Sequence, residues 1–213
     1  MATSLDRLLT QIRACRICAD EPDGAPLAHE PRPVLRASKS ARLAVVGQAP
    51  GTRVHASGVP FSDPSGERLR DWMGVTPEEF YDVRRIAIIP MGFCFPGLDA
   101  SGGDLPPRRE CARRWRARLF AQLPQTELML LVGGYAQRWH LGCSAHRSVT
   151  ATVAGWRAIL EGSDRPHFLP LPHPSWRNHA WIKAHPEFET ELVPRLRAEV
   201  RGLLGCGERK SAI

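Results

Sequence analysis

The chain has 213 residues, of which 43% are hydrophobic, enough for one domain of ordinary size with its own core. No apolar run approaches the roughly 20 residues that a membrane span requires. Asp6, Arg7 and Arg13 interrupt the apolar residues at the start of the chain, so no signal peptide is predicted. We therefore expect a single cytoplasmic domain over residues 1–213, without membrane contact.

The formal net charge is +7, from 29 Lys and Arg against 22 Asp and Glu. This balance suits a polyanionic partner such as nucleic acid. Nearly all of the positive charge is Arg, which can also reflect a genome rich in G and C. Charge by itself therefore leaves the partner open.

Apolar residues recur at helical spacing over residues 4–18, which predicts an N-terminal helix, and residues 19–40 are predicted to form a loop. Short apolar runs predict four buried strands, at 43–46, 86–89, 128–132 and 168–171. Further helices are predicted at 65–74, 108–123, 134–141 and 186–204, whereas 144–164 has no clear pattern. We expect the end of the chain, about 205–213, to be a disordered tail.

The alternation of strands and helices predicts an α/β fold. We expect a three-layer sandwich with a central four-stranded, mainly parallel sheet flanked by helices. In such sheets, functional residues gather in the loops after the carboxyl ends of the strands. The segments 47–51, 90–97 and 172–178 occupy such positions and form the candidate site.

Three features in or near these loops could carry chemistry. The segment 47–51, Gly-Gln-Ala-Pro-Gly, is a stiff turn whose backbone N–H groups could bind a carbonyl or an anion, or else a plain strand-to-helix turn. Phe61 lies in a loop rich in Gly and Pro, where it could stack on a base or anchor the loop to the core. His173 follows the last strand, where it could donate to an oxyanion or be a loop histidine without a role. Trp176 and Arg177 beside it could enter a duplex and contact phosphates.

The order of these motifs resembles the uracil-DNA glycosylase superfamily, over about residues 8–200. Gly-Gln-Ala-Pro-Gly after the first strand corresponds to that family's water-activating motif, and His-Pro-Ser at 173–175 begins its second motif. The sequence His-Pro-Ser-Trp-Arg-Asn is similar to the single-strand-selective monofunctional branch, as is Gly-Val-Pro-Phe followed by Arg70-Asp71-Trp72. The resemblance implies a monomeric, monofunctional hydrolase that removes uracil from DNA and starts base excision repair, associated with the nucleoid through DNA.

The resemblance also assigns roles to individual residues. His173 would donate a hydrogen bond to the uracil oxygen that becomes negative as the glycosidic bond breaks, and Gln48 or Asp63 would position the attacking water. The flipped base would contact Gly47, Gln48, Ala49, Phe61, Met91, Gly92 and His173. The DNA around the base would be contacted by Ser175, Trp176, Arg177 and Asn178.

Two departures from the family pattern keep other functions open. Gln48 stands where the iron–sulfur branch usually has an acid, and glutamine cannot accept a proton from water. Asp63 could take that role, although it could instead cap the next helix. The segment 90–93 lacks the Asn with which relatives read the uracil edge. The alternatives are a glycosylase for hypoxanthine or xanthine, a lesion-binding protein with little turnover, and a redox-sensing DNA-binding protein.

His55, in the loop before Phe61, could also face the pocket, or be a solvated loop histidine.

The cysteines resemble a further branch of the family. Cys15 and Cys18 form a C-x-x-C pair, the spacing of two ligands of one metal centre. In the iron–sulfur glycosylases a third cysteine follows the second strand and a fourth lies on the next helix, where this chain has Cys94 and Cys111. The resemblance implies a [4Fe–4S] cluster, with zinc or separate buried thiols as alternatives, that fastens the N-terminal helix to the domain. Two further cysteines have no matching positions and are predicted to be structural or incidental: Cys143 and Cys206.

Overall fold

A four-stranded sheet forms the centre of the computed structural model, which describes residues 3–162 and 164–205. The strands are β1 (Leu43–Val46), β2 (Ile86–Ile88), β3 (Leu128–Val132) and β4 (His167–Leu171). They are ordered β2-β1-β3-β4, and all three pairs are parallel. The predicted α/β sandwich is confirmed, and the sheet is parallel throughout.

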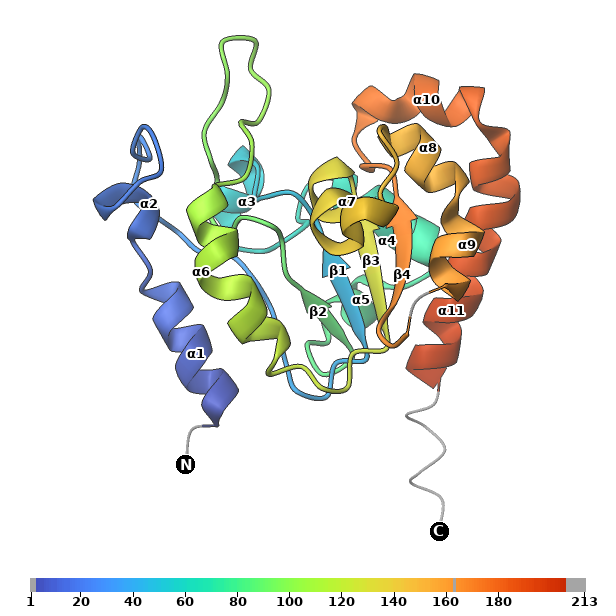
Figure 1. Ribbon diagram of the computed structural model, residues 1–213, viewed down its shortest axis with the longest axis horizontal. Coiled ribbons are helices and arrows are strands. Elements are labelled where there is room, and N and C mark those ends of the chain that lie inside the picture. The colour runs from blue at the N-terminus through green and yellow to red at the C-terminus, as the bar shows by residue number, and fades with distance from the viewer. Residues whose placement is uncertain (1–2, 163, 206–213) are drawn as a thin grey trace.

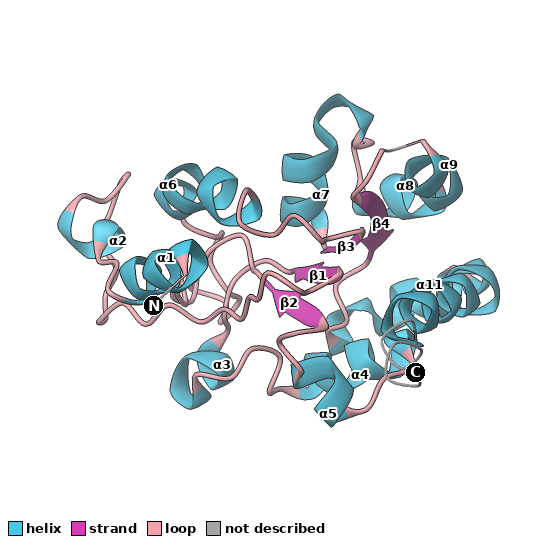
Figure 2. Ribbon diagram, turned by 90° about the horizontal axis from the view of Figure 1, so that it is seen from below, coloured by secondary structure: helices cyan, strands magenta, loops and turns pink. Residues whose placement is uncertain are grey.

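Helices cover both faces of the sheet, which gives three layers (Figures 1 and 2). Alternate side chains of β1 enter the two faces: Leu43 and Val45 pack on one side, and Ala44 and Val46 on the other. The first side is covered by α4 (Pro64–Met73), α5 (Pro77–Tyr81), α8 (Val149–Ala154), α9 (Trp156–Glu161), α10 (His179–Ala184) and α11 (Val193–Gly205). The second is covered by α1 (Ser4–Arg13), α2 (Ile17–Asp20), α6 (Arg109–Phe120) and α7 (Gly134–Leu141).

The structure differs from the sequence prediction at both ends of the chain. The predicted helix over 4–18 is two helices, since α1 ends at Arg13 and the chain turns before α2, which packs against α6. The predicted helix over 186–204 begins with a π-helical turn, Phe188–Leu192, before α11. Pro194 explains this turn, because it has no N–H to donate to the preceding turn of helix.

Three short helices had no counterpart in the prediction: α3 (Thr52–Ser57), α5 and α10. The unassigned stretch 144–164 holds α8 and α9. Cys206 and the predicted tail lie outside the described residues, apart from residue 205 at the end of α11. Of the residues described, none belongs to a helix long and apolar enough to cross a membrane.

Candidate functional site

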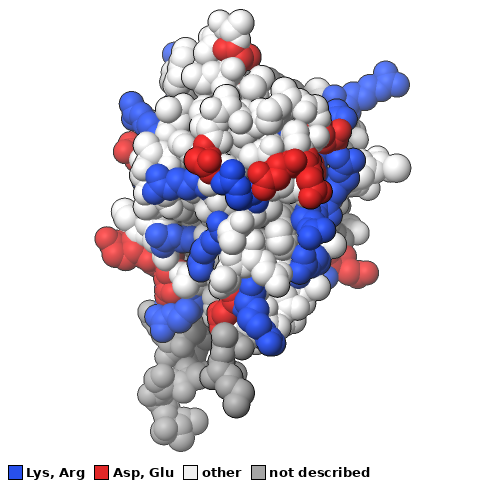
Figure 3. Space-filling view, turned by 90° about the vertical axis from the view of Figure 1, so that its left-hand side faces the viewer, with Lys and Arg blue, Asp and Glu red and all other residues white. Residues whose placement is uncertain are grey.

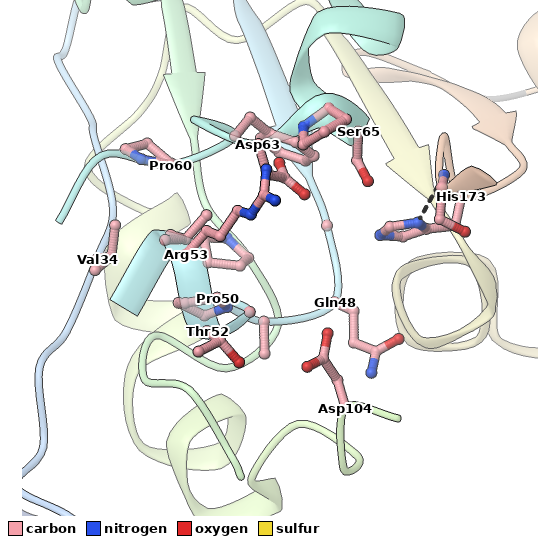
Figure 4. Close-up of a pocket in the computed structure, with 18 of the residues that line it drawn as sticks. Val34, Gln48, Pro50, Thr52, Arg53, Pro60, Asp63, Ser65, Asp104 and His173 are labelled. Carbon is pink, nitrogen blue, oxygen red and sulfur yellow. Dashed lines mark hydrogen bonds between the residues drawn. The ribbon is translucent and has the colours of Figure 1, made fainter. Parts of the chain in front are cut away.

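A cavity of about 630 Å³ opens at the carboxyl ends of the strands, within the range typical of small-molecule sites. Figure 4 shows the side chains of several loops pointing into it. Most of the residues that the sequence singled out line it: Gly47, Gln48, Ala49, Phe61, Asp63, His173, Ser175, Trp176, Arg177 and Asn178. The loops after β1 and β4 therefore meet with the segment that precedes α4, as expected.

The loop after β1 is anchored to the segment that follows β2. The N–H of Met91 donates to the carbonyl of Gly47 over 2.9 Å, and the N–H of Gly92 donates to the carbonyl of Gln48 over 3.0 Å. Met91 is buried in the core on the α6 side. Neither Met91 nor Gly92 lines the cavity, contrary to the expectation that they contact a base, and Pro90 is the residue of this segment that does.

Phe61 is held in an unusual backbone conformation. Its φ of 53° lies in the left-handed region, which a residue with a side chain rarely adopts. The carbonyl of Phe61 accepts hydrogen bonds from the Tyr81 hydroxyl at 3.0 Å and from Arg70 Nη1 at 3.1 Å, and these contacts stabilise the turn. A Cβ at Gly47 would lie only 3.2 Å from the ring, so the loop after β1 needs glycine there to let the ring approach.

His173 presents a fixed hydrogen-bond donor to the cavity. The backbone N–H of Ser175 donates to Nδ1 of His173 over 3.2 Å, drawn as a dashed line in Figure 4. Because Nδ1 accepts, the proton of the neutral ring is on Nε2. Burial lowers the pKa of His173, and the charge of Asp63 only partly opposes this, so the ring is neutral near pH 7. The Asn178 side-chain amide donates to the His173 carbonyl over 2.7 Å and fixes the loop.

The two residues expected to position water, Asp63 and Gln48, both form hydrogen bonds within the protein. Asp63 is the N-cap of α4, where its Oδ1 accepts from the N–H of Gly66 over 3.3 Å. The amide of Gln48 donates from Nε2 to the carbonyl of Leu105 over 3.3 Å. Both line the cavity, and both have a structural contact besides.

The rim of the cavity combines exposed apolar side chains with arginine. Trp176 is 77% exposed, and the Arg177 guanidinium lies over its ring at 5.8 Å. Leu98 and Leu105, in the loop between β2 and α6, are also exposed. Exposed indole and leucine side chains beside a cation are typical of protein surfaces whose side chains insert between the stacked bases of DNA.

The positive charge is not gathered into one patch on the side of the molecule nearest α1 and α2. Figure 3 shows Lys and Arg there interspersed with Asp and Glu. Several of the arginines form ion pairs, among them Arg16 with Asp20 and Arg113 with Asp23. The rim of the cavity, and not this side, is therefore the better candidate for a nucleic-acid interface.

Four cysteines, Cys15, Cys18, Cys94 and Cys111, lie near enough to one another near the contact of α2 with α6 for their charges to interact. Cys18, Cys94 and Cys111 are buried, and Cys15 is partly exposed. Burial, followed by the neighbouring charge of Glu110, raises the pKa of Cys18 to about 11. Burial, with the sulfurs of Cys18 and Cys15, raises the pKa of Cys94 to about 12. Burial likewise raises the pKa of Cys111, and the other three sulfurs add to it.

Hydrogen-bond donors point at two of these sulfurs. The indole Nε1 of Trp115 donates to Cys15 over 3.2 Å, and the backbone N–H of Phe93 donates to Cys111 over 3.4 Å. Such donors suit a thiolate better than a neutral thiol. Within residues 3–162 and 164–205, however, no three His, Cys, Asp or Glu side chains form a group that could hold a metal ion. Metal binding by the four cysteines therefore stays a prediction.

The remaining candidates lie elsewhere. The imidazole of His55 packs against His29, with ring centroids 4.5 Å apart, and against Phe95 at 5.7 Å. His55 does not line the cavity, so the expectation that it could face the pocket is not supported. Cys143 is exposed, away from the four clustered cysteines.

The sequence prediction missed two charged residues of the cavity, Arg53 and Asp104. Arg53 belongs to α3, a helix that was not predicted. Asp104 lies in the irregular loop before α6, which has no periodic pattern to place it. The only signal was general: a carboxylate in a long loop at the carboxyl end of a parallel strand.

The family model described as the uracil DNA glycosylase superfamily matches residues 36–197. The match spans the whole sheet and every residue that lines the cavity except Val34. The segment with Cys15 and Cys18 lies before the matched region.

Proposed function

The chain belongs to the uracil DNA glycosylase superfamily, and from this premise we propose that it is a monofunctional glycosylase that releases uracil from DNA. The target base would leave the stack and enter the cavity, because an enzyme cannot reach the glycosidic bond inside a duplex. There it would stack on Phe61 and meet the loop 47–51, while Trp176 and Arg177 hold the rim against the DNA.

The observation that carries this proposal is the neutral His173 with its proton on Nε2. When the glycosidic bond breaks, negative charge develops on the leaving base. A preorganised N–H donor stabilises that charge more in the transition state than in the substrate. The donor is fixed from both sides, by Ser175 at Nδ1 and by Asn178 at the backbone carbonyl.

The lining of the cavity supports a monofunctional reaction. A glycosylase that also cleaves the strand forms a Schiff base through an amine, usually that of lysine. Among the described residues that line the cavity there is no lysine. Water is therefore the proposed nucleophile.

A second candidate activity is the removal of hypoxanthine or xanthine. The end of β2 offers Pro90 to the cavity and no side-chain amide, and the amide of Gln48 already donates to Leu105. A pocket without a dedicated donor–acceptor pair discriminates poorly between related bases. The lesion-binding alternative, in which nothing is released, is favoured by the neutral side chain of Gln48.

One experiment separates these candidates. The purified chain is incubated with single- and double-stranded oligonucleotides that carry uracil, hypoxanthine or xanthine, and abasic sites are then cleaved with alkali. Cleavage at uracil supports the main proposal, and cleavage mainly at the purines supports the alternative. Tight binding of the lesion oligonucleotide without free base would leave only the lesion-binding function.

We also propose that Cys15, Cys18, Cys94 and Cys111 hold a [4Fe–4S] cluster. The proposal is supported by four mutually close sulfurs, of which three are buried and two receive N–H donors. Such a cluster would supply a covalent tie between α2, the loop after β2 and α6.

Iron analysis and spectroscopy test this proposal. The purified protein should be brown, absorb broadly near about 400 nm and contain about four irons per chain. Cys18→Ser should lose the iron and the absorption, whereas Cys143→Ser, a change of an exposed cysteine, should keep both. A colourless protein without iron that melts normally would refute the cluster, and bound zinc would replace iron in the proposal.

A further inference from the structure

The loop between β2 and α6 contains a hairpin that brings a carboxylate to the cavity. The N–H of Asp99 donates to the carbonyl of Gly103 over 2.8 Å, and that of Leu105 donates to Gly97 over 2.9 Å. The Asp99 side chain accepts from the N–H groups of Ser101 and Gly103 and so closes the turn. These bonds hold Asp104, which pairs with Leu98 across the hairpin, in a fixed place.

The hairpin contacts both ends of the loop after β1, through Asp104 at one end and Leu105 at the other. A Cβ at Gly51 would lie 3.3 Å from Oδ2 of Asp104, so the carboxylate is packed against that backbone. At the other end, the amide of Gln48 is bound to Leu105, the next residue of the hairpin. Figure 4 shows the Asp104 carboxylate beside the Gln48 side chain at the edge of the cavity.

The carboxylate of Asp104 has no structural hydrogen bond or ion pair among the described residues. In the part of the chain that the structure describes, it accepts no hydrogen bond and forms no ion pair, in contrast to Asp63, which caps α4. The residue as a whole is exposed, while its carboxylate is partly covered by the loop after β1, so water reaches it from the cavity side. A carboxylate that is fixed by its backbone, open to water and without a partner is suited to bind and activate that water.

We propose that Asp104 is the catalytic base of the reaction proposed above, on which this inference depends. The acid that the first motif lacks at Gln48 would thus come from a different segment of the chain. As the bond between the base and C1′ of the sugar breaks, its electron pair leaves with the base, whose negative charge His173 stabilises. Asp104 orients a water whose oxygen bonds to C1′, and the carboxylate takes one proton from it. The base anion then takes a proton from solvent.

The charges around Asp104 support this role. Partial burial raises the pKa of Asp104, and the neighbouring carboxylates of Asp63 and Asp99 raise it further, against the opposing charge of Arg177. A carboxylate with a raised pKa accepts a proton more readily than an ordinary aspartate. Because the base must be ionised, the rate should fall as the pH drops through this raised pKa.

The test compares single-turnover base release by three Asp→Asn variants over a range of pH. Asp104→Asn should lower the rate by about 10²–10⁴-fold and remove the acid limb of the pH profile. Asp164→Asn, a change of an exposed aspartate that does not line the cavity, should stay within about threefold of the wild type. Asp63→Asn should lose less than Asp104→Asn and should keep the acid limb.

A second variant separates chemistry from folding. Gln48→Glu in the Asp104→Asn background returns an acid to the first motif, and it should recover at least about tenfold of the lost rate. Binding of DNA that carries an abasic site should be retained in Asp104→Asn, which shows a folded protein. If the wild type releases base but Asp104→Asn keeps its rate and its acid limb, this inference is wrong while the proposed function stands. If the wild type releases no base from any lesion, the proposed function fails, and the inference fails with it.

Discussion

At the scale of single residues, the proposed chemistry depends most on one hydrogen bond, from Nε2 of His173. Loss of a preorganised donor to a developing oxyanion costs about 3–4 kcal/mol, or 10²–10³ in rate. His173→Ala should therefore lower single-turnover base release by about this factor, with little change in the affinity for lesion DNA. His179→Ala is the matched control, because His179 is exposed, lies on the same stretch of chain and does not line the cavity. Full activity of His173→Ala would show that the leaving base is stabilised by some other group.

Phe61 offers a separate test of how the base is held. Stacking of a base on an aromatic side chain contributes on the order of 1–3 kcal/mol. Phe61→Ala should therefore reduce base release by about ten- to a hundredfold. The fold should survive, because the ring is only partly buried and the turn is held through its carbonyl by Tyr81 and Arg70. Ser62→Ala, at the exposed neighbour, controls for disturbance of the loop. Unchanged rates in Phe61→Ala would mean that the ring only packs against the backbone of Gly47.

Functional residues were easiest to predict from the sequence where a recognisable neighbouring element fixes their position. His173 and the segment 47–51 could be predicted because each comes soon after a strand with a strong apolar run, and Phe61 because it lies in a loop rich in Gly and Pro. Asp104 could not, since its place depends on hydrogen bonds that close a hairpin in a loop without periodicity. Met91 was misplaced for a related reason. The N–H that could have read a base is used to anchor Gly47.

At the scale of elements, the strands were easier to predict than the short helices. The strands β1, β2 and β3 are fully buried and consist of continuous apolar runs, as parallel strands do, and β4 is buried over its last three residues. The helix α5 has only five residues, too few for a periodic pattern, although the capping box of Thr76 and Glu79 indicates where it starts. The helix α3 begins at Thr52 after a glycine N-cap that offers no side-chain hydrogen bond, so nothing in its sequence marks its start.

Two elements meet at the rim, where the loop after β4 lies against the hairpin. A Cβ at Gly103 would be 3.4 Å from Nη1 of Arg177, so the guanidinium rests on the hairpin backbone. This contact would hold Arg177 and the exposed Trp176 in position to fill the gap left by a flipped nucleotide. Both sides of the rim would then act together on a duplex.

The prediction for this rim compares duplex with single-stranded DNA. Arg177→Ala should reduce base release from a duplex more than from a single strand, because only the duplex has a closed stack to be held open. Arg195→Ala, which removes an exposed arginine on α11, serves as the control for the loss of one positive charge. The ratio of single-turnover rates on the two substrates is the measurement. An equal loss on both would reduce Arg177 to a phosphate contact.

At the scale of the whole molecule, the layer between the sheet and α6 contains a buried cation. Arg116 is 1% exposed, and its Nη1 donates to the carbonyl of Pro90 over 2.9 Å. Its Nη2 lies 2.6 Å from Nε2 of His140 in α7. Since arginine can only donate, His140 must accept at Nε2 and stay neutral. The two side chains thus join α6, α7 and the end of β2 that lines the cavity.

This arrangement predicts how stability depends on pH. Burial, together with the charge of Arg116, lowers the pKa of His140 to about 3. In the unfolded chain the ring of His140 titrates at about pH 6.5. Below that pH the unfolded state binds a proton that the folded state does not bind. The contribution of His140 to stability is therefore complete above about pH 6.5 and is lost as the pH falls toward 3. The slope from this group is at most about 1.4 kcal/mol per pH unit.

The variant His140→Gln tests this link between a single ring and the stability of the fold. Glutamine keeps an acceptor oxygen for Arg116 but does not titrate, so urea unfolding of the variant should depend less steeply on pH between about 4 and 6.5. Carboxylates such as Glu79 and Glu127, whose pKa values their arginine partners lower, also lose stability in acid. The relevant quantity is therefore the difference between wild type and variant at each pH, since the carboxylates contribute equally to both. His179→Gln, at an exposed histidine, is the control for the loss of one imidazole. Parallel curves for wild type and His140→Gln would mean that His140 accepts its proton in the folded state and that Arg116 is satisfied by Pro90 alone.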